Sequence, residues 1–153
     1  MIGNKWDLIR DKSPSKINEY RTHYYRSFNL LRWAPVIFLS ALHKTNMGKL
    51  KETVMIVYQE RFRQITENAL NKFLKSLLKQ YKPTRGKGTA HPYIYRIKQA
   101  GVNPPQFSVQ IKDQTSLKYS YVHIIERELR AKFGFTGAPI KLWVEKIKKM
   151  NLE

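Results

Sequence analysis

The sequence predicts an α/β protein in two parts, and three observations support this. A short apolar run at residues 36–39 lies between two segments with helical periodicity, which is typical of a buried strand flanked by helices. Three strand-like segments follow a long helical pattern after residue 60. Positive charge is concentrated in the second part, so we expect one domain at residues 1–59 and another at residues 60–153.

The first part begins with residues 1–3, whose apolar character is that of the end of a strand. Ser13 followed by Pro14 predicts a helix start, with the serine as N-cap and the proline at the first helical position. Apolar residues spaced three and four apart between Ile17 and Leu31 predict a helix that Pro35 terminates.

The apolar run at 36–39 predicts a strand buried on both faces. The tripeptide Ser40-Ala41-Leu42 leads out of it into a polar loop that we expect to end near Gly48. Helices are predicted at about 49–58 and 62–80. The apolar stripe of the second helix comprises Ile65, Ala69, Phe73 and Leu77.

Alternation of apolar and polar residues predicts strands at 93–97 and 107–111, separated by a turn at 101–105. A helix is predicted at 119–133, with Gly134 as its C′ residue. One face of this helix would carry Val122, Ile125 and Leu129. A last strand at 139–144 and a basic tail at 146–153 complete the pattern. Two helices packed on one face of a three-stranded sheet would bury these apolar positions.

The charge balance points to a polyanionic partner. The 153 residues include 29 Lys and Arg against 11 Asp and Glu, a net charge of +18. Residues 1–59 contribute +6 and residues 60–153 contribute +12. Such an excess destabilises the compact state by self-repulsion, so we expect the second part to bind nucleic acid.

Several classes of protein are disfavoured. The absence of cysteine excludes disulfides and thiolate metal sites, and weakly favours a cytoplasmic location. The start has no apolar signal core, and no apolar run approaches the roughly 20 residues of a membrane span. The histidines, at positions 23, 43, 91 and 123, are too scattered for a metal site. We therefore predict no metal ligands, no catalytic residues and no membrane partner.

Asn4-Lys5-Trp6-Asp7 matches the NKxD motif of GTP-binding proteins. A carboxylate at Asp7 can accept from both the ring N–H and the exocyclic amine of guanine. Adenine cannot offer that pair of donors, so the wrong base would leave a carboxylate unpaired. The order NKxD, helix, strand, Ser-Ala-Leu, helix is that of the closing section of a Ras-like P-loop GTPase domain.

The chain as a whole resembles the bacterial GTPase family called Der or EngA. The residues that carry the resemblance are Asn4 to Leu8, Pro35 to Leu42, Asn103-Pro104-Pro105 and Gly137-Ala138-Pro139-Ile140. It covers almost the whole chain and ends near Val144. The resemblance implies the end of the second of two G domains, followed by a KH-like domain, in a protein of large-ribosomal-subunit assembly.

The resemblance also implies roles for single residues. Asn4 and Asp7 would contact guanine, and Lys5 would lay its aliphatic stem along the base. In the second loop the backbone around Ala41 would meet the guanine oxygen, and Trp6 would have only a packing role. The guanine-binding set is therefore Asn4, Lys5, Asp7, Ser40, Ala41 and Leu42.

The sequence departs from a complete GTPase. It contains no Gly-x-x-x-x-Gly-Lys-Ser/Thr loop, no switch regions and no Asp-x-x-Gly element. We expect this chain not to hydrolyse GTP alone and to bind GTP or GDP weakly or not at all. Mg²⁺ would be held only in the intact protein, and the chain would be a fragment of that longer protein.

The expected RNA-binding residues lie near the basic loop, the first sheet strand and the C-terminus of the second domain. They are Lys82, Arg85, Lys87, Arg96, Lys98, Lys141, Lys146, Lys148 and Lys149. Their contacts would be mainly to phosphates of ribosomal RNA in the large subunit, and would weaken with salt.

The segment from Gly134 to Gly137 matches the Gly-x-x-Gly loop of KH domains. In KH domains that loop joins two helices, whereas here it would join a helix to the last strand. We therefore interpret it as a helix C-cap and turn, and expect Gly137→Asp to harm folding more than RNA binding.

Two other functions stay open on the sequence alone. A stand-alone basic RNA-binding module would use the second domain without any nucleotide. A peripheral membrane protein would place its positive charge on anionic lipid, although the helices lack the mixed aromatic and lysine-rich face of interfacial helices.

Overall fold

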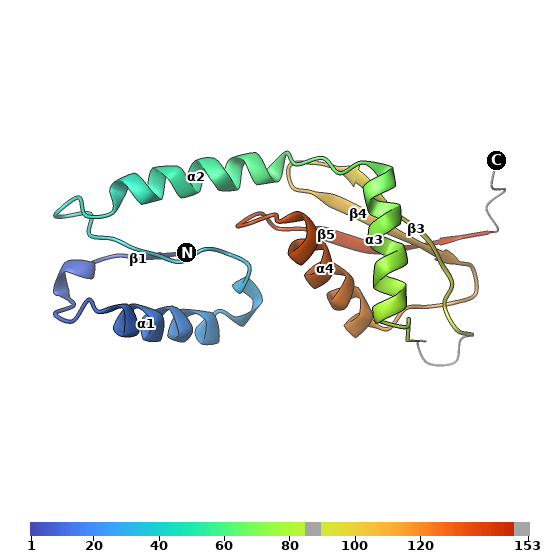
Figure 1. Cartoon of the computed structure of the whole chain (residues 1–153), viewed down its shortest axis with the longest axis horizontal. Helices are drawn as coiled ribbons and strands as arrows, with labels where there is room; N and C mark the ends of the chain where they lie inside the picture. Colours follow the sequence, from blue (N-terminus) through green and yellow to red (C-terminus); the bar gives the residue numbers. More distant parts are fainter. Residues whose placement is uncertain (85–89, 149–153) are drawn as a thin grey trace. The chain divides into compact units, whose positions relative to one another are not determined.

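The structure is a computed structural model of the whole chain, and it describes residues 1–84 and 90–148 (Figure 1). The chain contains both helices and strands, and three of the strands form one sheet. This confirms the predicted α/β class and three-stranded sheet. After residue 60 the order is helix, strand, strand, helix, strand, as expected.

Contacts divide the chain into two compact units. Unit 1 comprises Met1–Glu60 together with Thr136–Ala138. Unit 2 comprises Arg61–Phe135 together with the chain from Pro139 onward. The chain therefore changes unit directly after Glu60.

Unit 1 is built around a short parallel pair of strands, β1 (Ile2–Gly3) and β2 (Ile37–Phe38). Figure 1 shows this pair running between α1 (Pro14–Ser27) and α2 (Met47–Arg61). The predicted strand at 36–39 is shorter than expected because it pairs with only two residues of β1.

Aromatic rings form the core of unit 1. The Trp6 ring stacks on Phe38 with centroids 4.5 Å apart, and Tyr20 and Tyr24 meet these rings edge-on. Gly3 allows this packing, since a Cβ there would lie 2.5 Å from the Phe38 ring. An edge-on and a stacked ring pair each add about 1 kcal/mol beyond the area they bury.

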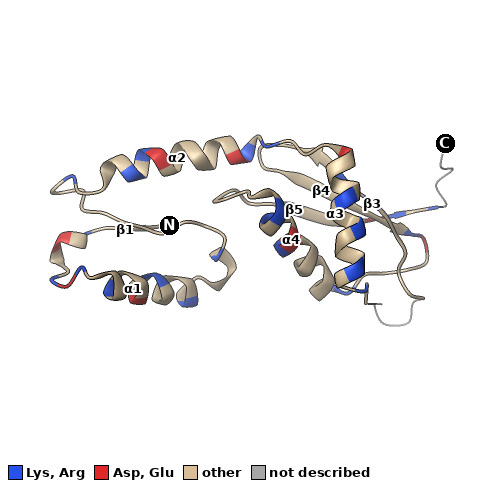
Figure 2. Cartoon of the chain, viewed as in Figure 1, with Lys and Arg blue, Asp and Glu red and all other residues tan. Residues whose placement is uncertain are grey.

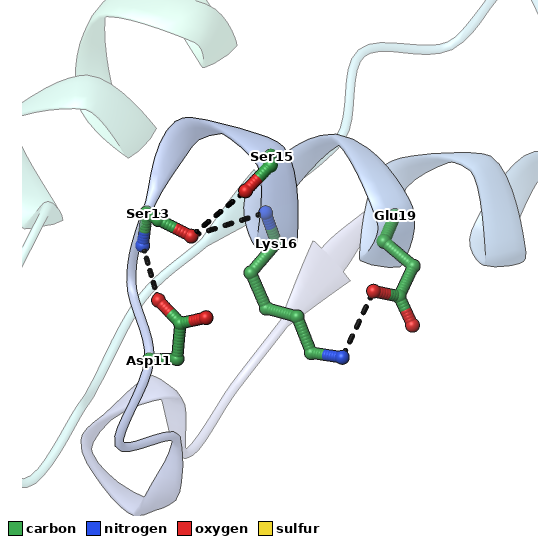
Figure 3. A network of polar contacts seen from close by, with 5 residues as sticks. All are labelled: Asp11, Ser13, Ser15, Lys16 and Glu19. Carbon is green, nitrogen blue, oxygen red and sulfur yellow. Dashed lines mark hydrogen bonds and ion pairs between the residues drawn. The ribbon is translucent and has the colours of Figure 1, made fainter.

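The start of α1 follows the sequence prediction. The Ser13 hydroxyl accepts a hydrogen bond from the Lys16 N–H at 3.4 Å, and the Ser13 N–H donates to Asp11 at 2.9 Å (Figure 3). The helix ends at Ser27, earlier than predicted. The remaining apolar residues continue into a separate 3-10 turn that ends at Leu31, because the backbone leaves the α conformation at residue 28.

The loop after β2 is also shorter than predicted. It ends at Asn46, so Gly48 lies inside α2. Asn46 has a positive φ of 61°, and its side-chain amide donates to the Phe38 carbonyl at 2.8 Å. Asn46 therefore turns the chain into the helix and ties that turn to β2.

Unit 2 contains β3 (Ile94–Gly101), β4 (Gln106–Lys112) and β5 (Lys141–Ile147) in the spatial order β3-β4-β5. β3 and β4 are antiparallel, whereas β4 and β5 are parallel. The parallel pair requires a crossover connection, which α4 (Tyr119–Phe133) supplies.

The helices α3 (Glu67–Gln80) and α4 cover one face of this sheet. Phe107, Val109 and Ile111 alternate along β4 and are fully buried in a cluster with residues of both helices. Residues at a spacing of two share one face of a strand. The other face of the sheet therefore carries the intervening residues, and we call it the open face.

The helix predicted at 62–80 begins later, at Glu67. The Thr66 hydroxyl accepts from the Ala69 N–H at 3.3 Å and caps the helix. The buried stripe also differs from the predicted one: Ile65 precedes the helix and Ala69 is only half-buried. The buried residues of α3 are Leu70, Phe73, Leu74 and Leu77.

Smaller corrections apply to the rest of unit 2. Helix α4 has the predicted bounds, but Tyr121 rather than Val122 is buried alongside Ile125 and Leu129. Gly101 belongs to β3, where it pairs with Gln106, instead of starting the turn. β3 begins after residue 93, and β5 occupies 141–147 instead of 139–144, so the first residues of the expected basic tail are strand.

Candidate guanine-recognition loops and basic sheet face

The structure brings the NKWD segment and the Ser-Ala-Leu segment together. The Asn4 side-chain oxygen accepts from the N–H of Lys5 at 2.8 Å and from the N–H of Ala41 at 3.1 Å. Lys5 adopts the left-handed conformation, with φ at 60°. The bend at Lys5 allows the Asn4 side chain to reach both loops, which are 37 residues apart in sequence.

Asp7 and Ser40 form the second link between these loops. A hydrogen bond from the Ser40 side chain lowers the pKa of Asp7, and the smaller effects of His43 and Lys12 act in the same direction. Burial, which opposes ionisation, is weaker than the hydrogen bond. Asp7 is therefore an ionised acceptor at neutral pH, as reading the guanine edge requires.

Ser40 is held from several sides. It is 1% exposed, its hydroxyl accepts from the His43 N–H at 3.2 Å, and its backbone exchanges two hydrogen bonds with Thr45. These bonds close residues 40–45 into a compact loop. Ser40 can therefore orient Asp7 from a fixed position.

A hollow of about 310 Å³ lies between the two loops. Its lining comprises Asn4, Lys5, Asp7, Leu8 and Leu42. Leu8 and Leu42 are 71% and 79% exposed, so an apolar surface is available beside the polar groups. The volume lies at the lower end of the range for small-ligand sites. Leu8 was missed on sequence, although it directly follows the NKWD motif.

Trp6 has the packing role predicted for it. Its side chain is 7% exposed, and its backbone N–H donates to the Leu39 carbonyl at 3.0 Å. Because it stacks on Phe38, Trp6 fixes the NKWD loop to β2 while Asn4 and Asp7 face the hollow.

Three of the predicted RNA-binding residues share the open face of the unit 2 sheet. Lys98 pairs with Ser108, and Lys141 pairs with Gln106, positions that alternate with the buried residues of β4. Arg96 pairs with Gln110 on the same face. The register therefore collects cations from β3 and β5, although Lys98 and Lys141 are 43 positions apart in sequence.

A hydrogen-bonded row crosses this face. The Arg96 Nε donates to the Gln110 side-chain oxygen at 2.6 Å, and the Gln110 amide donates to Glu145 at 2.9 Å. Gln110 is only 8% exposed, so its amide is fixed between the two charged groups. The open face thus contains a carboxylate as well as its cations.

The other predicted RNA-binding residues are placed elsewhere or lie outside the described residues. Lys146 pairs with the buried Ile111, so it belongs to the face that the helices cover, near the end of β5. Lys82 and Lys148 are exposed after α3 and β5 respectively. The predicted positions outside the described residues are Arg85, Lys87 and Lys149.

Comparison with known proteins identifies the family of the chain. Residues 64–145, more than half of the chain, match the family described as the KH-domain-like of EngA bacterial GTPase enzymes, C-terminal. The chain belongs to this EngA family.

Similar proteins named GTPase Der cover nearly all of this EngA-family chain. The protein of Thermoanaerobacter sp. (strain X514) is 32% identical over 95% of the chain and 33% of its own length. That of Caldicellulosiruptor saccharolyticus is 36% identical over 90% of the chain and 31% of its length. The protein of Ruminiclostridium cellulolyticum is 33% identical over 99% of the chain and 34% of its own length. The chain therefore spans about a third of the length of these relatives.

A second basic surface lies on α3 of the EngA-family chain (Figure 2). Lys72, Lys75 and Lys79 are exposed and spaced three and four residues apart, so they follow one side of the helix. These lysines are absent from the predicted RNA-binding set, although their spacing within the helical pattern indicates a basic stripe.

The Gly-x-x-Gly segment joins α4 to β5, as predicted, instead of joining two helices. Gly134 ends α4 with φ at 92°, and Gly137 has φ at 72°. A Cβ at Gly137 would collide with Val57 and lie 3.1 Å from Pro35. Both the positive φ and the packing therefore require glycine, which supports the predicted folding defect of Gly137→Asp.

Over residues 1–84 and 90–148, no helix combines the length and apolar character needed to cross a bilayer. Across the same residues, no three or more acidic, histidine or cysteine side chains are grouped as they would be to hold a metal ion.

Proposed function

We propose that this chain is the C-terminal portion of a GTPase that acts in cytoplasmic ribosome biogenesis, with guanine recognition in unit 1 and docking on large-subunit ribosomal RNA in unit 2. One observation carries the proposal: Asn4 and Asp7 of the NKWD segment are bonded to the Ser-Ala-Leu loop around a shared hollow. The EngA family and the Der relatives supply the context of a bacterial GTPase.

The polar and apolar groups around the hollow fit a guanine base. The ionised Asp7 accepts from the ring N–H and the exocyclic amine, and the exposed Leu8 and Leu42 cover apolar ring surface. The Lys5 stem would lie along the base, and the backbone around Ala41, whose N–H donates to Asn4 in this structure, would meet the guanine oxygen. The nucleotide phosphates and Mg²⁺ depend on parts of the longer protein, because this sequence has no Gly-x-x-x-x-Gly-Lys-Ser/Thr loop.

Unit 2 would contact RNA mainly through phosphates. Lys98 and Lys141 are exposed on the open face with Arg96 beside them. Such contacts fix position and orientation more than sequence. In the longer protein, GTP would act as a switch that changes how unit 2 meets the ribosome.

The guanine site is tested by the variant Asp7→Asn. The substitution replaces one acceptor oxygen with a donor amide, so it disfavours guanine and favours xanthine, which has a carbonyl in place of the exocyclic amine. Amide NMR spectra of the 153-residue chain are recorded with millimolar GDP, ADP or xanthosine diphosphate. GDP should shift residues 4–8 and 40–42 of the wild type, and xanthosine diphosphate should replace it for Asp7→Asn.

Equal shifts with ADP and GDP would contradict guanine recognition. The same holds if no nucleotide shifts these residues, and the stand-alone RNA-binding module would then be the better account. Nanomolar GDP binding by the isolated chain would refute the expectation that the phosphates need the rest of the protein.

A further inference from the structure

The open face of the unit 2 sheet carries a large aromatic side chain, Trp143, which is 40% exposed. It belongs to β5 and pairs with Ser108 of β4, which in turn pairs with Lys98 of β3. Lys141 lies two residues before Trp143 on the same face. A partly exposed indole thus shares this face with two exposed lysines, one across the sheet and one along its own strand.

We propose that the open face binds a single-stranded segment of RNA, with one unpaired base stacked on Trp143 and the flanking phosphates at Lys98 and Lys141. The proposal rests on RNA docking by unit 2 and deepens it, because it specifies the strandedness of the RNA and the residue that selects it.

The geometry of the sheet fits this occupant. Lys98 and Trp143 are two strand spacings apart, about 10 Å, and Lys141 precedes Trp143 by about 7 Å along β5. Ser108, between Lys98 and Trp143, has a short side chain that is 3% exposed. The flexible lysine stems can therefore reach phosphates on either side of a base that lies against the indole.

The aromatic ring is the reason to specify a single strand. In a duplex the faces of the bases are covered by their neighbours, and a side chain on a sheet reaches only phosphates, sugars and groove edges. An unpaired base offers its face, and stacking on an aromatic side chain tolerates any base. Lysines alone would accept either form of RNA.

The acidic group on this face restricts the path of the RNA. Glu145 lies two residues after Trp143 and accepts a hydrogen bond from Gln110, which is itself bonded to Arg96. A phosphate next to Glu145 would be repelled, although Arg96 in the same row reduces that repulsion. The backbone should therefore pass on the Lys98 and Lys141 side of the indole.

An acidic protein segment is the alternative occupant of a basic surface. It would satisfy the lysines through charge and would gain little from the indole ring. Two measurements therefore distinguish RNA from an acidic protein segment: the loss of affinity when the indole ring is removed, and the preference for single-stranded over double-stranded RNA.

The test uses fluorescence anisotropy of the 153-residue chain with two labelled RNA probes, a uridine decamer and a ten-base-pair duplex. Trp143→Leu removes the ring but keeps an apolar side chain, and should weaken decamer binding about tenfold. Trp143→Phe retains a stacking surface and should remain within about threefold of the wild type. Tyr119→Leu is the matched control, because Tyr119 is 75% exposed on α4; it should leave affinity unchanged.

Intrinsic fluorescence gives a readout that does not depend on the leucine variant being folded. The decamer should quench wild-type tryptophan fluorescence, and the quenching should be lost in Trp143→Phe, which keeps Trp6 and Trp33. Quenching that persists in Trp143→Phe would overturn the proposal.

Other outcomes separate this proposal from the RNA docking on which it rests. If Trp143→Leu binds the decamer normally while Lys98→Gln/Lys141→Gln binds it weakly, docking stands and stacking is refuted. An equal loss for decamer and duplex would also refute selection of a single strand. Polyglutamate that displaces the decamer equally well from wild type and Trp143→Leu would identify an acidic protein segment as the occupant.

Discussion

At the scale of single residues, recognition depends on which atoms of Asn4 and Asp7 are already engaged. Asn4 uses its side-chain oxygen to hold Lys5 and Ala41, so its amide N–H groups point away from those backbone donors. Asp7 accepts from Ser40, which keeps one orientation of the carboxylate. The contacts of the two residues therefore differ: Asn4 joins the loops through its side-chain oxygen, and Asp7 is held by Ser40.

Ser40→Ala should raise the pKa of Asp7 towards its ordinary value of 3.8, because the hydrogen bond that lowers it most is lost. A carboxyl group with a lowered pKa in the folded state stabilises the fold above its unfolded pKa and loses that contribution as the pH falls through the folded pKa. In Ser40→Ala the folded and unfolded pKa values of Asp7 should be closer, so the free energy of unfolding should depend less on Asp7 as the pH falls. Carbon-detected NMR titration of the Asp7 carboxyl group measures the shift, and an unchanged pKa would show that Ser40 does not hold Asp7.

The NKWD and Ser-Ala-Leu residues could be identified from sequence because a local motif specifies both residue type and order. Trp143 could not. Its neighbours on the open face depend on the registers that pair β5 with β4 and β4 with β3. A shift in register by one residue moves a side chain to the opposite face of a sheet, so the open face was accessible only from the structure.

At the scale of elements, helical periodicity found α1, α3 and α4, but the break between α2 and α3 was misplaced. The segment between them is held by tertiary contacts: Gln99 accepts from the Ile65 N–H at 2.8 Å and donates to the Arg63 carbonyl at 2.9 Å. Asn103 exchanges two hydrogen bonds with Arg61 in the same way. Partners from β3 and the turn after it cannot be read from the local pattern.

Tyr121 joins the two helices of unit 2. Its hydroxyl donates to the Tyr81 carbonyl at 2.7 Å, just past the end of α3, and burial raises its pKa to about 12. Tyr121→Phe should lower the free energy of unfolding by about 1 kcal/mol at neutral pH, because the Tyr81 carbonyl loses a buried donor. Urea denaturation measures this effect, and Tyr119→Phe, at an exposed site of the same helix, is the control.

The pH dependence follows from the same residue. Tyr121 ionises more readily in the unfolded chain, near pH 10, than in the folded one, so its contribution to stability is present below pH 10 and is lost as the pH rises towards 12. Tyr121→Phe should therefore lose less stability than the wild type over this range. An equal loss in both proteins would show that Tyr121 is not the group responsible.

At the scale of the whole molecule, the two units differ in how well their helices are buried. Neither α1 nor α2 contains a buried residue, and Val54, Met55 and Ile56 of α2 remain about half-exposed. Unit 2, in contrast, buries residues from both helices and from β3 and β4 in one cluster. Unit 1 should therefore be the less stable of the two.

Hydrogen exchange tests this difference directly. Amides in α1 and α2 should exchange more than about a hundredfold faster than those in α4, because local openings range from near zero to the global free energy of unfolding. Equal protection in the two units would mean that the chain unfolds as one cooperative body. Repeating the measurement with GDP should slow exchange in residues 4–8 and 40–45 if the nucleotide binds there.

RNA docking through the open face is tested most directly by making the same charge change on two different surfaces of the chain. Binding of the 153-residue chain to large-subunit ribosomal RNA is measured over a series of salt concentrations for Lys98→Gln/Lys141→Gln on the open face and Lys75→Gln/Lys79→Gln on α3. We predict that the sheet variant binds more weakly and that its slope of log affinity against log salt falls by about 1 to 2, while the α3 variant matches the wild type. Equal losses in both variants, or an affinity that does not depend on salt, would contradict docking through the open face.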